Sequence, residues 1–188
     1  IARGVCPTEP EFGLPQAEEK LRALFEEVAS GVPRDEVSGV VISSAGPINP
    51  HSGIYVHPPN LPGWHDMTMK PGLRASLNLR ITIGHDATLG ALAESRYGVG
   101  KGAQHLVYVT LSTGVGGGII ANGQMVTGAR GHAGEIGHLL VLPGGQSCNV
   151  GCDGCLEGIA SGGGIARAAT TAINAGRSSS MLDMAGGD

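Results

Sequence analysis

The stretch from Ser112 to Glu157 reads STGVGGGIIANGQMVTGARGHAGEIGHLLVLPGGQSCNVGCDGCLE, and the rest of the chain is interpreted around it. It opens with a glycine-rich turn. The pair Asn122-Gly123, which follows an apolar run, is the strongest short signal for a β-hairpin. A histidine, three closely spaced cysteines and a carboxylate then close the stretch. This part of the chain therefore combines β structure with a candidate metal site.

The candidate metal ligands are His138, Cys148, Cys152 and Cys155. One imidazole and three thiolates form a closed tetrahedral set for zinc, and Cys152-x-x-Cys155 has the spacing of a zinc knuckle. The alternative is a group of reduced, buried thiols. We predict Zn²⁺ in a structural role, because a closed ligand set leaves no open position for water.

Outside this stretch, apolar periodicity predicts that strands and helices alternate. The predicted helices span residues 16–30, 73–77, 87–97 and 165–175, and the predicted strands span residues 37–43, 79–83, 106–111 and 138–142. We expect residues 178–188 to lack clear structure. Alternation of this kind, with a hairpin inserted, predicts an α/β fold with a mixed sheet.

Composition excludes several classes of partner. The formal net charge of −4 and the scattered Arg and Lys residues argue against a nucleic-acid surface. No apolar run approaches the roughly 20 residues that a membrane helix needs. We therefore expect neither nucleic acid nor membrane as a partner of this chain. Three of the 4 cysteines are clustered, which favours a metal site over disulfides and predicts a reducing, cytoplasmic setting.

Two further features each have two interpretations. Asp86 lies between a predicted strand and a predicted helix, where it is either a general base or a helix N-cap. The segment 112–118 is either an anion-binding turn of backbone N–H groups or a glycine-rich bend in a strand. Glu135 and Glu157 flank the metal ligands. Each is either a solvated surface residue or a carboxylate held in place to bind sugar hydroxyls.

Three segments, in this order, resemble the ROK family (repressors, open reading frames and kinases), which has the actin-like ATPase fold. Residues 86–94 resemble the segment that carries the catalytic Asp, and residues 111–120 resemble the second phosphate motif, Thr-Gly-x-Gly-Gly-Gly. Residues 134–157 resemble the Glu-x-Gly-His step and the zinc knuckle that ends in Cys-Leu-Glu. Gly46-Pro47 and residues 59–64 match weaker signatures.

The resemblance implies an actin-like ATPase (ribonuclease H-like) fold and a glucokinase-like hexose kinase that acts on the 6-hydroxyl of its sugar. Asp86 would be the general base, and His138 would bind both sugar and zinc. The implied substrate-binding residues are His85, Glu135, His138, Glu157, Gly46 and Asn60. The implied contacts with the phosphates of ATP, which is used with Mg²⁺, are Thr113, Gly114, Gly116 and Gly117. A homo-oligomer, dimer or tetramer, is also implied, and the alternative function is the sugar-sensing domain of a ROK repressor.

The chain departs from the family pattern at several positions. His85 and Thr88 stand where the family has asparagine, so the resemblance does not identify the sugar. Val150 replaces the usual second knuckle cysteine, and Cys152 appears two positions later. The opening Asp-x-Gly-Gly-Thr motif and the closing adenosine-binding part are not found. We therefore expect an incomplete fold, with residues 1–84 from an N-terminal small domain and residues 85–188 from the start of a C-terminal large domain that holds the zinc knuckle. We also expect the isolated chain to be weak or inactive.

Overall fold

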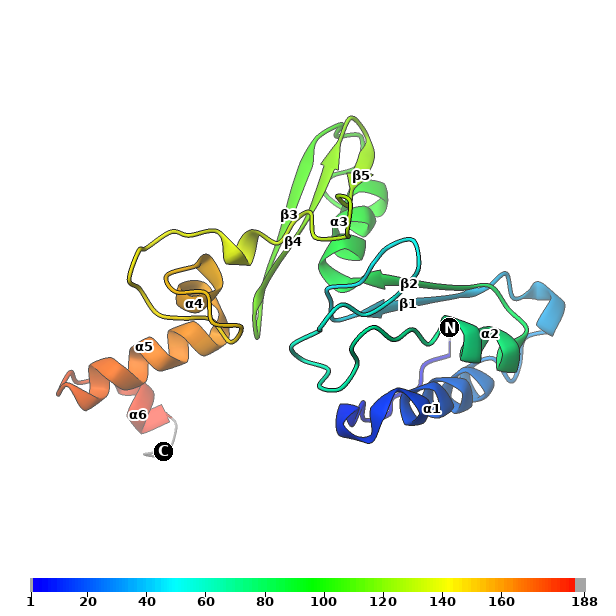
Figure 1. The fold of residues 1–188 in the computed structure, drawn as a ribbon, viewed down its shortest axis with the longest axis horizontal. Coiled ribbons are helices and arrows are strands. Elements are labelled where there is room, and N and C mark those ends of the chain that lie inside the picture. The colour runs from blue at the N-terminus through cyan, green and yellow to red at the C-terminus, as the bar shows by residue number, and fades with distance from the viewer. Residues whose placement is uncertain (1, 185–188) are drawn as a thin grey trace. The chain divides into compact units, whose positions relative to one another are not determined.

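The computed structural model describes residues 2–184. Its α-helices and strands, labelled in Figure 1, are α1 (Gly13–Val28), β1 (Val40–Ser44), α2 (Lys70–Leu77), β2 (Ile81–His85), α3 (Asp86–Tyr97), β3 (Leu106–Leu111), β4 (Val115–Ala121), β5 (Gln124–Val126), α4 (Leu156–Ala160), α5 (Gly162–Asn174) and α6 (Ser180–Met184). The described residues also form the short 3-10 helices η1 (Pro10–Phe12), η2 (Arg34–Glu36) and η3 (Ile136–His138). Backbone packing divides the chain into two units. The first runs up to Tyr108 and also contains Gly118–Gly134, and the second contains Val109–Gly117 and the residues from Glu135 onward.

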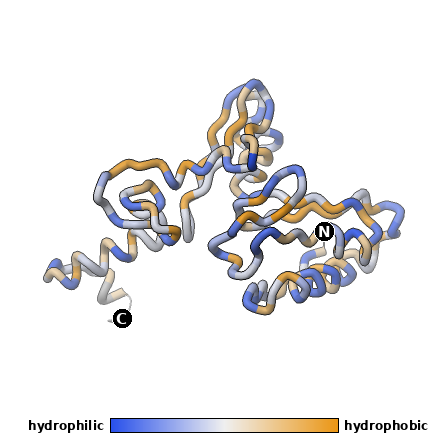
Figure 2. The backbone as a smooth tube through the Cα atoms, in the orientation of Figure 1, coloured by the Kyte–Doolittle hydropathy of each residue, from blue (hydrophilic) through white to orange (hydrophobic). Residues whose placement is uncertain are grey.

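The first unit is built on the parallel pair β1 and β2. Their register runs from Val40 opposite Ile81 to Ser44 opposite His85. Both strands consist largely of apolar residues, whereas much of α1 is hydrophilic (Figure 2). Leu73 and Leu77 of α2 are 1% and 2% exposed and belong to the same core as Ile81. Because the carboxyl ends of parallel strands share one edge, this register brings the segments after β1 and β2 together.

The proline-rich loop after β1 is tied to that edge. It begins at a cis peptide bond between Gly46 and Pro47. Tyr55 is fully buried, packs edge-on against Trp64 at a ring-centroid distance of 5.3 Å, and donates a hydrogen bond to Ser44 Oγ at 3.0 Å. These contacts hold the loop in place. The loop contains isolated β-bridges but no regular strand, as its prolines predict.

Helix α3 follows β2 directly and packs against β2 and β1. It therefore belongs to the first unit, and the division between units does not fall at residue 84. The boundary between the two units instead runs through two strands: it cuts β3 between residues 108 and 109 and β4 between residues 117 and 118. How the residues divide between the two domains of a complete protein stays a prediction.

The second sheet has the strand order β3-β4-β5, and β4 pairs with β5 in antiparallel fashion. Asn122 and Gly123 connect these strands with φ values of 51° and 71°. Two successive positive φ values are those of a type I′ turn, which confirms the predicted hairpin. The parallel pair β1 and β2 forms one sheet, and β3 to β5 form another, within the α/β fold that the sequence predicted.

Three predictions for the second unit were wrong. In the tail 178–188, which we expected to lack clear structure, Ser180–Met184 form α6, and residues 185–188 lie outside the described part of the chain. Residues 138–142 do not form a strand: His138 ends η3, and these residues pair only through an isolated bridge between Leu140 and Cys155. Helix α5 begins at Gly162, earlier than the predicted start at residue 165, because the Ser161 hydroxyl accepts a hydrogen bond from Gly164 N at 3.0 Å and caps the helix. Among the described residues, no helix has the length and apolarity needed to cross a membrane.

Candidate functional site

Asp86 is the first residue of α3, and its carboxylate is held by one oxygen. Its Oδ1 accepts a hydrogen bond from the backbone N–H of Ala87 at 2.7 Å and lies 3.1 Å from Nε2 of His85. The side chain is 58% exposed. The N-cap position belongs to His85, so the alternative interpretation of Asp86 as the cap is wrong. A carboxylate with one anchored and one open oxygen is suited to accept a proton.

His85, the last residue of β2, is enclosed more tightly than Asp86. Its side chain is 15% exposed, and Nδ1 lies 3.5 Å from the hydroxyl of Thr88. The ring also lies against the backbone of Gly46, where an added Cβ would come 2.6 Å from the ring carbon Cδ2. A residue larger than glycine at position 46 would collide with the imidazole. Gly46 therefore allows His85 to lie at the carboxyl edge of the parallel strands.

Asn60 lies in the proline-rich loop of the first unit and is exposed. Its neighbours anchor the turn, since Leu61 N donates to Pro58 O at 3.1 Å and Leu61 and Trp64 are buried. Its position as a candidate sugar contact stays a prediction.

In the second unit, the candidate phosphate segment is a bend that leads into a strand. Thr113 and Gly114 lie in the bend, and Gly116 and Gly117 lie within β4. This is the glycine-rich strand bend of the two alternatives. The backbone N–H groups of the bend remain candidates for contact with phosphate.

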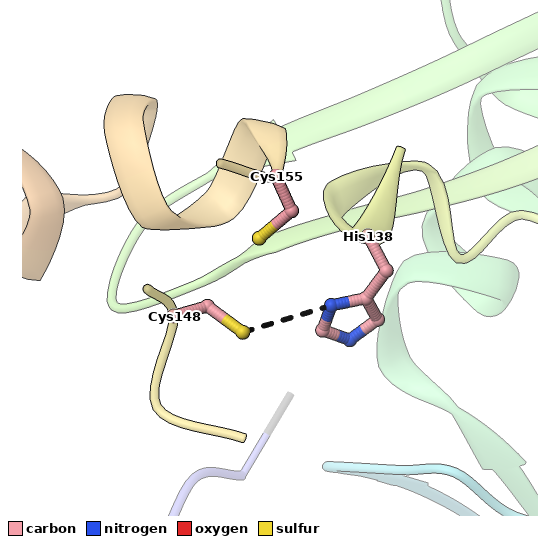
Figure 3. A group of neighbouring side chains, drawn as sticks. All are labelled: His138, Cys148 and Cys155. Atoms are coloured by element: carbon pink, nitrogen blue, oxygen red, sulfur yellow. Dashed lines mark hydrogen bonds between the residues drawn. The ribbon is translucent and has the colours of Figure 1, made fainter. Parts of the chain in front are cut away.

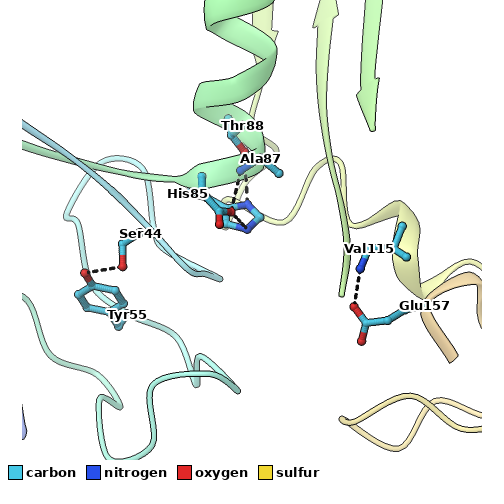
Figure 4. A network of polar contacts seen from close by, with 8 residues as sticks. Ser44, Tyr55, His85, Ala87, Thr88, Val115 and Glu157 are labelled. Atoms are coloured by element: carbon cyan, nitrogen blue, oxygen red, sulfur yellow. Dashed lines mark hydrogen bonds and ion pairs between the residues drawn. The ribbon is translucent and has the colours of Figure 1, made fainter. Parts of the chain in front are cut away.

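Glu157 connects this bend to α4. Its Oε2 accepts a hydrogen bond from the backbone N–H of Val115 at 2.9 Å (Figure 4). A Cβ added at Gly114 would lie 2.5 Å from the same oxygen. Gly114 thus leaves room for the carboxylate, and Glu157 is a half-buried, oriented group rather than a freely solvated one.

Glu135 and His138 bracket η3 in the second unit. Glu135 is half-buried, and its carbonyl oxygen accepts a hydrogen bond from His138 N at 3.2 Å. Gly137 between them packs so closely on the carbonyl of Val115 that any Cβ would clash with that oxygen. The Glu-Ile-Gly-His step therefore fixes both candidate side chains next to the start of β4.

His138, Cys148 and Cys155 converge on one point (Figure 3). Their ligand atoms all lie within 4.8 Å of one another, and Nδ1 of His138 is 3.9 Å from Sγ of Cys148. Both sulfurs are buried and accept N–H groups, Cys148 from Cys152 N at 3.4 Å and Cys155 from Gly158 N at 3.3 Å. The donor set and its convergence fit a zinc ion. Cys152 does not belong to this group, so its role as a fourth ligand stays a prediction.

The local environment shifts the pKa values of the Cys148 and Cys152 thiols in opposite directions. Burial opposes ionisation of Cys148, but hydrogen bonds from the backbone of Cys152 and Val150 outweigh it, so the pKa of the Cys148 thiol lies below its ordinary value. Burial, followed by the neighbouring Cys148, raises the pKa of Cys152. Cys148 is therefore the better prepared of the two to bind a metal as thiolate.

Two functional contacts were not predicted. Thr88 approaches His85 from three positions later, which is the spacing of reciprocal contacts at a helix start. That spacing was visible in the sequence. The bond from Val115 N to Glu157 spans 42 positions and follows only from the fold.

The chain resembles known sugar kinases over most of its length. It is 41% identical over 149 residues to a glucokinase of Halalkalibacterium halodurans, covering 79% of this chain and 45% of that protein. It is 33% identical over 145 residues to a putative xylose repressor of Caldicellulosiruptor sp., covering 76% and 36%. The chain thus spans about half or less of the length of these curated relatives.

Solved structures of ROK kinases are also similar to this chain. A ROK hexokinase from Thermus thermophilus superposes with a TM-score of 0.78 at 34% identity, covering 92% of this chain and 57% of the other. A ROK family glucokinase from Streptomyces griseus, in complex with glucose and AMPPNP, gives 0.78 at 30% identity, covering 93% and 54%. The fold class predicted from the sequence, α/β of the actin-like ATPase type, is confirmed by these neighbours.

The ROK family model matches residues 15–186, which is most of the chain. Taken with the relatives and the solved structures, this match shows that the chain belongs to the ROK family.

Proposed function

We propose that the complete protein transfers the γ-phosphoryl group of ATP to the 6-hydroxyl of a glucose-like hexose, with Asp86 as the general base. The observation that carries this proposal is the half-anchored carboxylate, whose Oδ1 bonds Ala87 N–H at 2.7 Å while the side chain stays 58% exposed. The open oxygen would take the proton of the sugar hydroxyl as the phosphoryl group is transferred.

The other candidate residues have supporting roles. Glu157, Glu135 and His138 would hold ring hydroxyls through charge-assisted hydrogen bonds. The support is that Glu157 is already oriented by the backbone of Val115 at 2.9 Å. The bend at Thr113 and Gly114 would approach the phosphates of ATP, whose charge Mg²⁺ neutralises when bound.

A zinc ion held by His138, Cys148 and Cys155 would be structural. Cys155 is the N-cap of α4, and Glu157 lies in the first turn of that helix. Fixing Cys155 therefore fixes the backbone that carries Glu157. Reduced thiols are needed for this role, which is consistent with a reducing cellular compartment.

A coupled assay of ATP consumption tests the proposal on the protein expressed from its complete gene, with glucose, N-acetylglucosamine, N-acetylmannosamine and fructose as substrates. We expect phosphorylation of at least one of these hexoses and loss of turnover in Asp86→Ala, with sugar binding retained by calorimetry. Turnover that survives in Asp86→Ala would refute the assignment of the base.

The second candidate is the effector domain of a ROK repressor, which the similarity to the putative xylose repressor supports. The same experiment separates the two functions. A repressor would bind a sugar without consuming ATP, and its complete gene would encode a DNA-binding segment.

A further inference from the structure

The imidazole of His85 is held on three sides within the first unit. Nε2 lies 3.1 Å from Asp86 Oδ1, and Nδ1 lies 3.5 Å from the Thr88 hydroxyl. The backbone of Gly46 closes a third side, where a Cβ would come 2.6 Å from the ring. At 15% exposure the ring has little room to adopt another orientation.

A neutral imidazole satisfies this arrangement in one tautomer. Nε2–H then faces Asp86 Oδ1 in a close polar contact at 3.1 Å, and Nδ1 accepts from the hydroxyl of Thr88. Both nitrogens have a partner, and no buried polar atom of the ring is left without one. The opposite tautomer would place a ring nitrogen without hydrogen against a carboxylate oxygen, which is repulsive.

Asp86 needs an anchor of this kind. Its only side-chain hydrogen bond within the described part of the chain is from Ala87 N–H, the adjacent residue. That bond leaves a 58% exposed carboxylate free to turn. The contact of His85 Nε2 with Oδ1 at 3.1 Å restricts the carboxylate at that oxygen and leaves Oδ2 as the open oxygen.

From this geometry we propose that His85 is a positioning residue for Asp86, which aims Oδ2 at the hydroxyl to be deprotonated. The proposal rests on the proposed function of Asp86 as the base. It differs from a role in sugar binding, because His85 acts through the carboxylate and not through a sugar hydroxyl. The two roles predict different kinetics: loss of positioning lowers kcat, whereas loss of uniform substrate binding raises KM.

The kinetic test uses His85→Phe and His85→Gln in the protein expressed from its complete gene. Phe keeps a flat ring without a nitrogen, and Gln restores a side-chain N–H at about the reach of Nε2. Since misplacement of a catalytic group by about 1 Å costs on the order of 10²-fold, we expect His85→Phe to lower kcat by about 10- to 100-fold with little change in the KM of the hexose. His85→Gln should recover most of the loss, and the exposed control His51→Gln should match the unchanged protein.

A measurement independent of turnover uses ¹⁵N-¹H NMR of the histidine rings. We expect the Nε2–H tautomer at His85, and Asp86→Asn should shift its ring nitrogens, whereas His51 should not respond. An Nδ1–H tautomer, no response to Asp86→Asn, or an unchanged kcat in His85→Phe would overturn the proposal. If no hexose is phosphorylated, the proposed function fails, and the NMR result still decides whether His85 orients Asp86.

Discussion

If the proposed zinc ion is bound by His138, Cys148 and Cys155, its removal should destabilise the second unit more than any other single perturbation of this site. In tetrahedral zinc with bonds of about 2.3 Å to sulfur and about 2.0 Å to nitrogen, ligand atoms lie roughly 3.5–3.8 Å apart. His138 Nδ1 and Cys148 Sγ are 3.9 Å apart, and the whole group of three lies within 4.8 Å. The ligands therefore have to close by about 1 Å at most, so little rearrangement opposes binding.

A ligand that binds only the folded state at a free concentration 1,000 times its Kd stabilises that state by about 4 kcal/mol. At roughly 2–4 °C per kcal/mol for a chain of this size, EDTA should lower the Tm of the zinc-loaded protein by about 8–16 °C. Differential scanning calorimetry with and without EDTA measures this shift. Metal analysis should give one zinc per chain.

Cobalt substitution identifies the ligands, because thiolate ligation produces intense charge-transfer absorption. The absorption should be lost in Cys148→Ser and Cys155→Ser and kept in the control Cys6→Ser, whose cysteine is exposed and distant in sequence. Cys152→Ser decides whether this residue supplies the fourth ligand. A protein that holds no zinc, or whose cobalt spectrum is unaffected by Cys148→Ser, would refute the zinc site.

Three further perturbations test the packing and the local contacts. Leu73→Ala removes a side chain that is 1% exposed in the core, so we expect a loss of about 2–5 kcal/mol in the free energy of unfolding of the first unit, measured with urea. In Gly114→Ala the new Cβ would meet Glu157 Oε2 at 2.5 Å and displace it from its backbone donor, and the lost charged hydrogen bond should cost about 1.5–3 kcal/mol. Unchanged urea midpoints would contradict either expectation. Burial raises the pKa of Tyr55 above its ordinary 10.0, although the bond to Ser44 lowers it, so the folded state keeps a proton that the unfolded state loses at alkaline pH. Stability should therefore be complete below pH 10 and fall as the pH rises above it, and Tyr55→Phe should flatten that alkaline fall.

Much of the fold could be predicted because local signals agreed with it. Asn122-Gly123 specifies a turn with two positive φ values, and the structure has φ of 51° and 71° there. The apolar pattern of residues 106–111 predicted β3 with the bounds that the structure gives. In these places short-range chemistry and tertiary packing favour the same conformation.

Secondary structure was predicted wrongly from the sequence where tertiary contacts determine the backbone conformation. Residues 138–142 were predicted as a strand, yet the side chains of residues 139–142 are 51–63% exposed. Their backbone bonds instead to the knuckle, since the N–H groups of Val141 and Leu142 both donate to Gly154 O at 3.0 Å. The helix predicted from residue 165 starts at Gly162, because the cap from Ser161 overrides the low helix propensity of glycine.

The candidate site could be predicted in its residue types but not in its pairings. The spacing of His138 and the cysteines pointed to a metal group, and three of those residues converge. The contact of His85 with Asp86 was not predicted, because adjacent residues seldom face each other unless a chain bend turns them together. That bend is the junction of β2 and α3, where Asp86 begins the helix.

The most direct test of the account compares Asp86→Asn with the unchanged protein from the complete gene under saturating hexose and ATP. Asn keeps the size of the side chain and removes its ability to accept a proton. Because a general base contributes roughly 10²- to 10⁴-fold, we predict a loss of kcat of at least about 100-fold, with the Kd of the hexose nearly unchanged by calorimetry. A kcat that stays within a few-fold of the unchanged protein would show that this carboxylate is not the base.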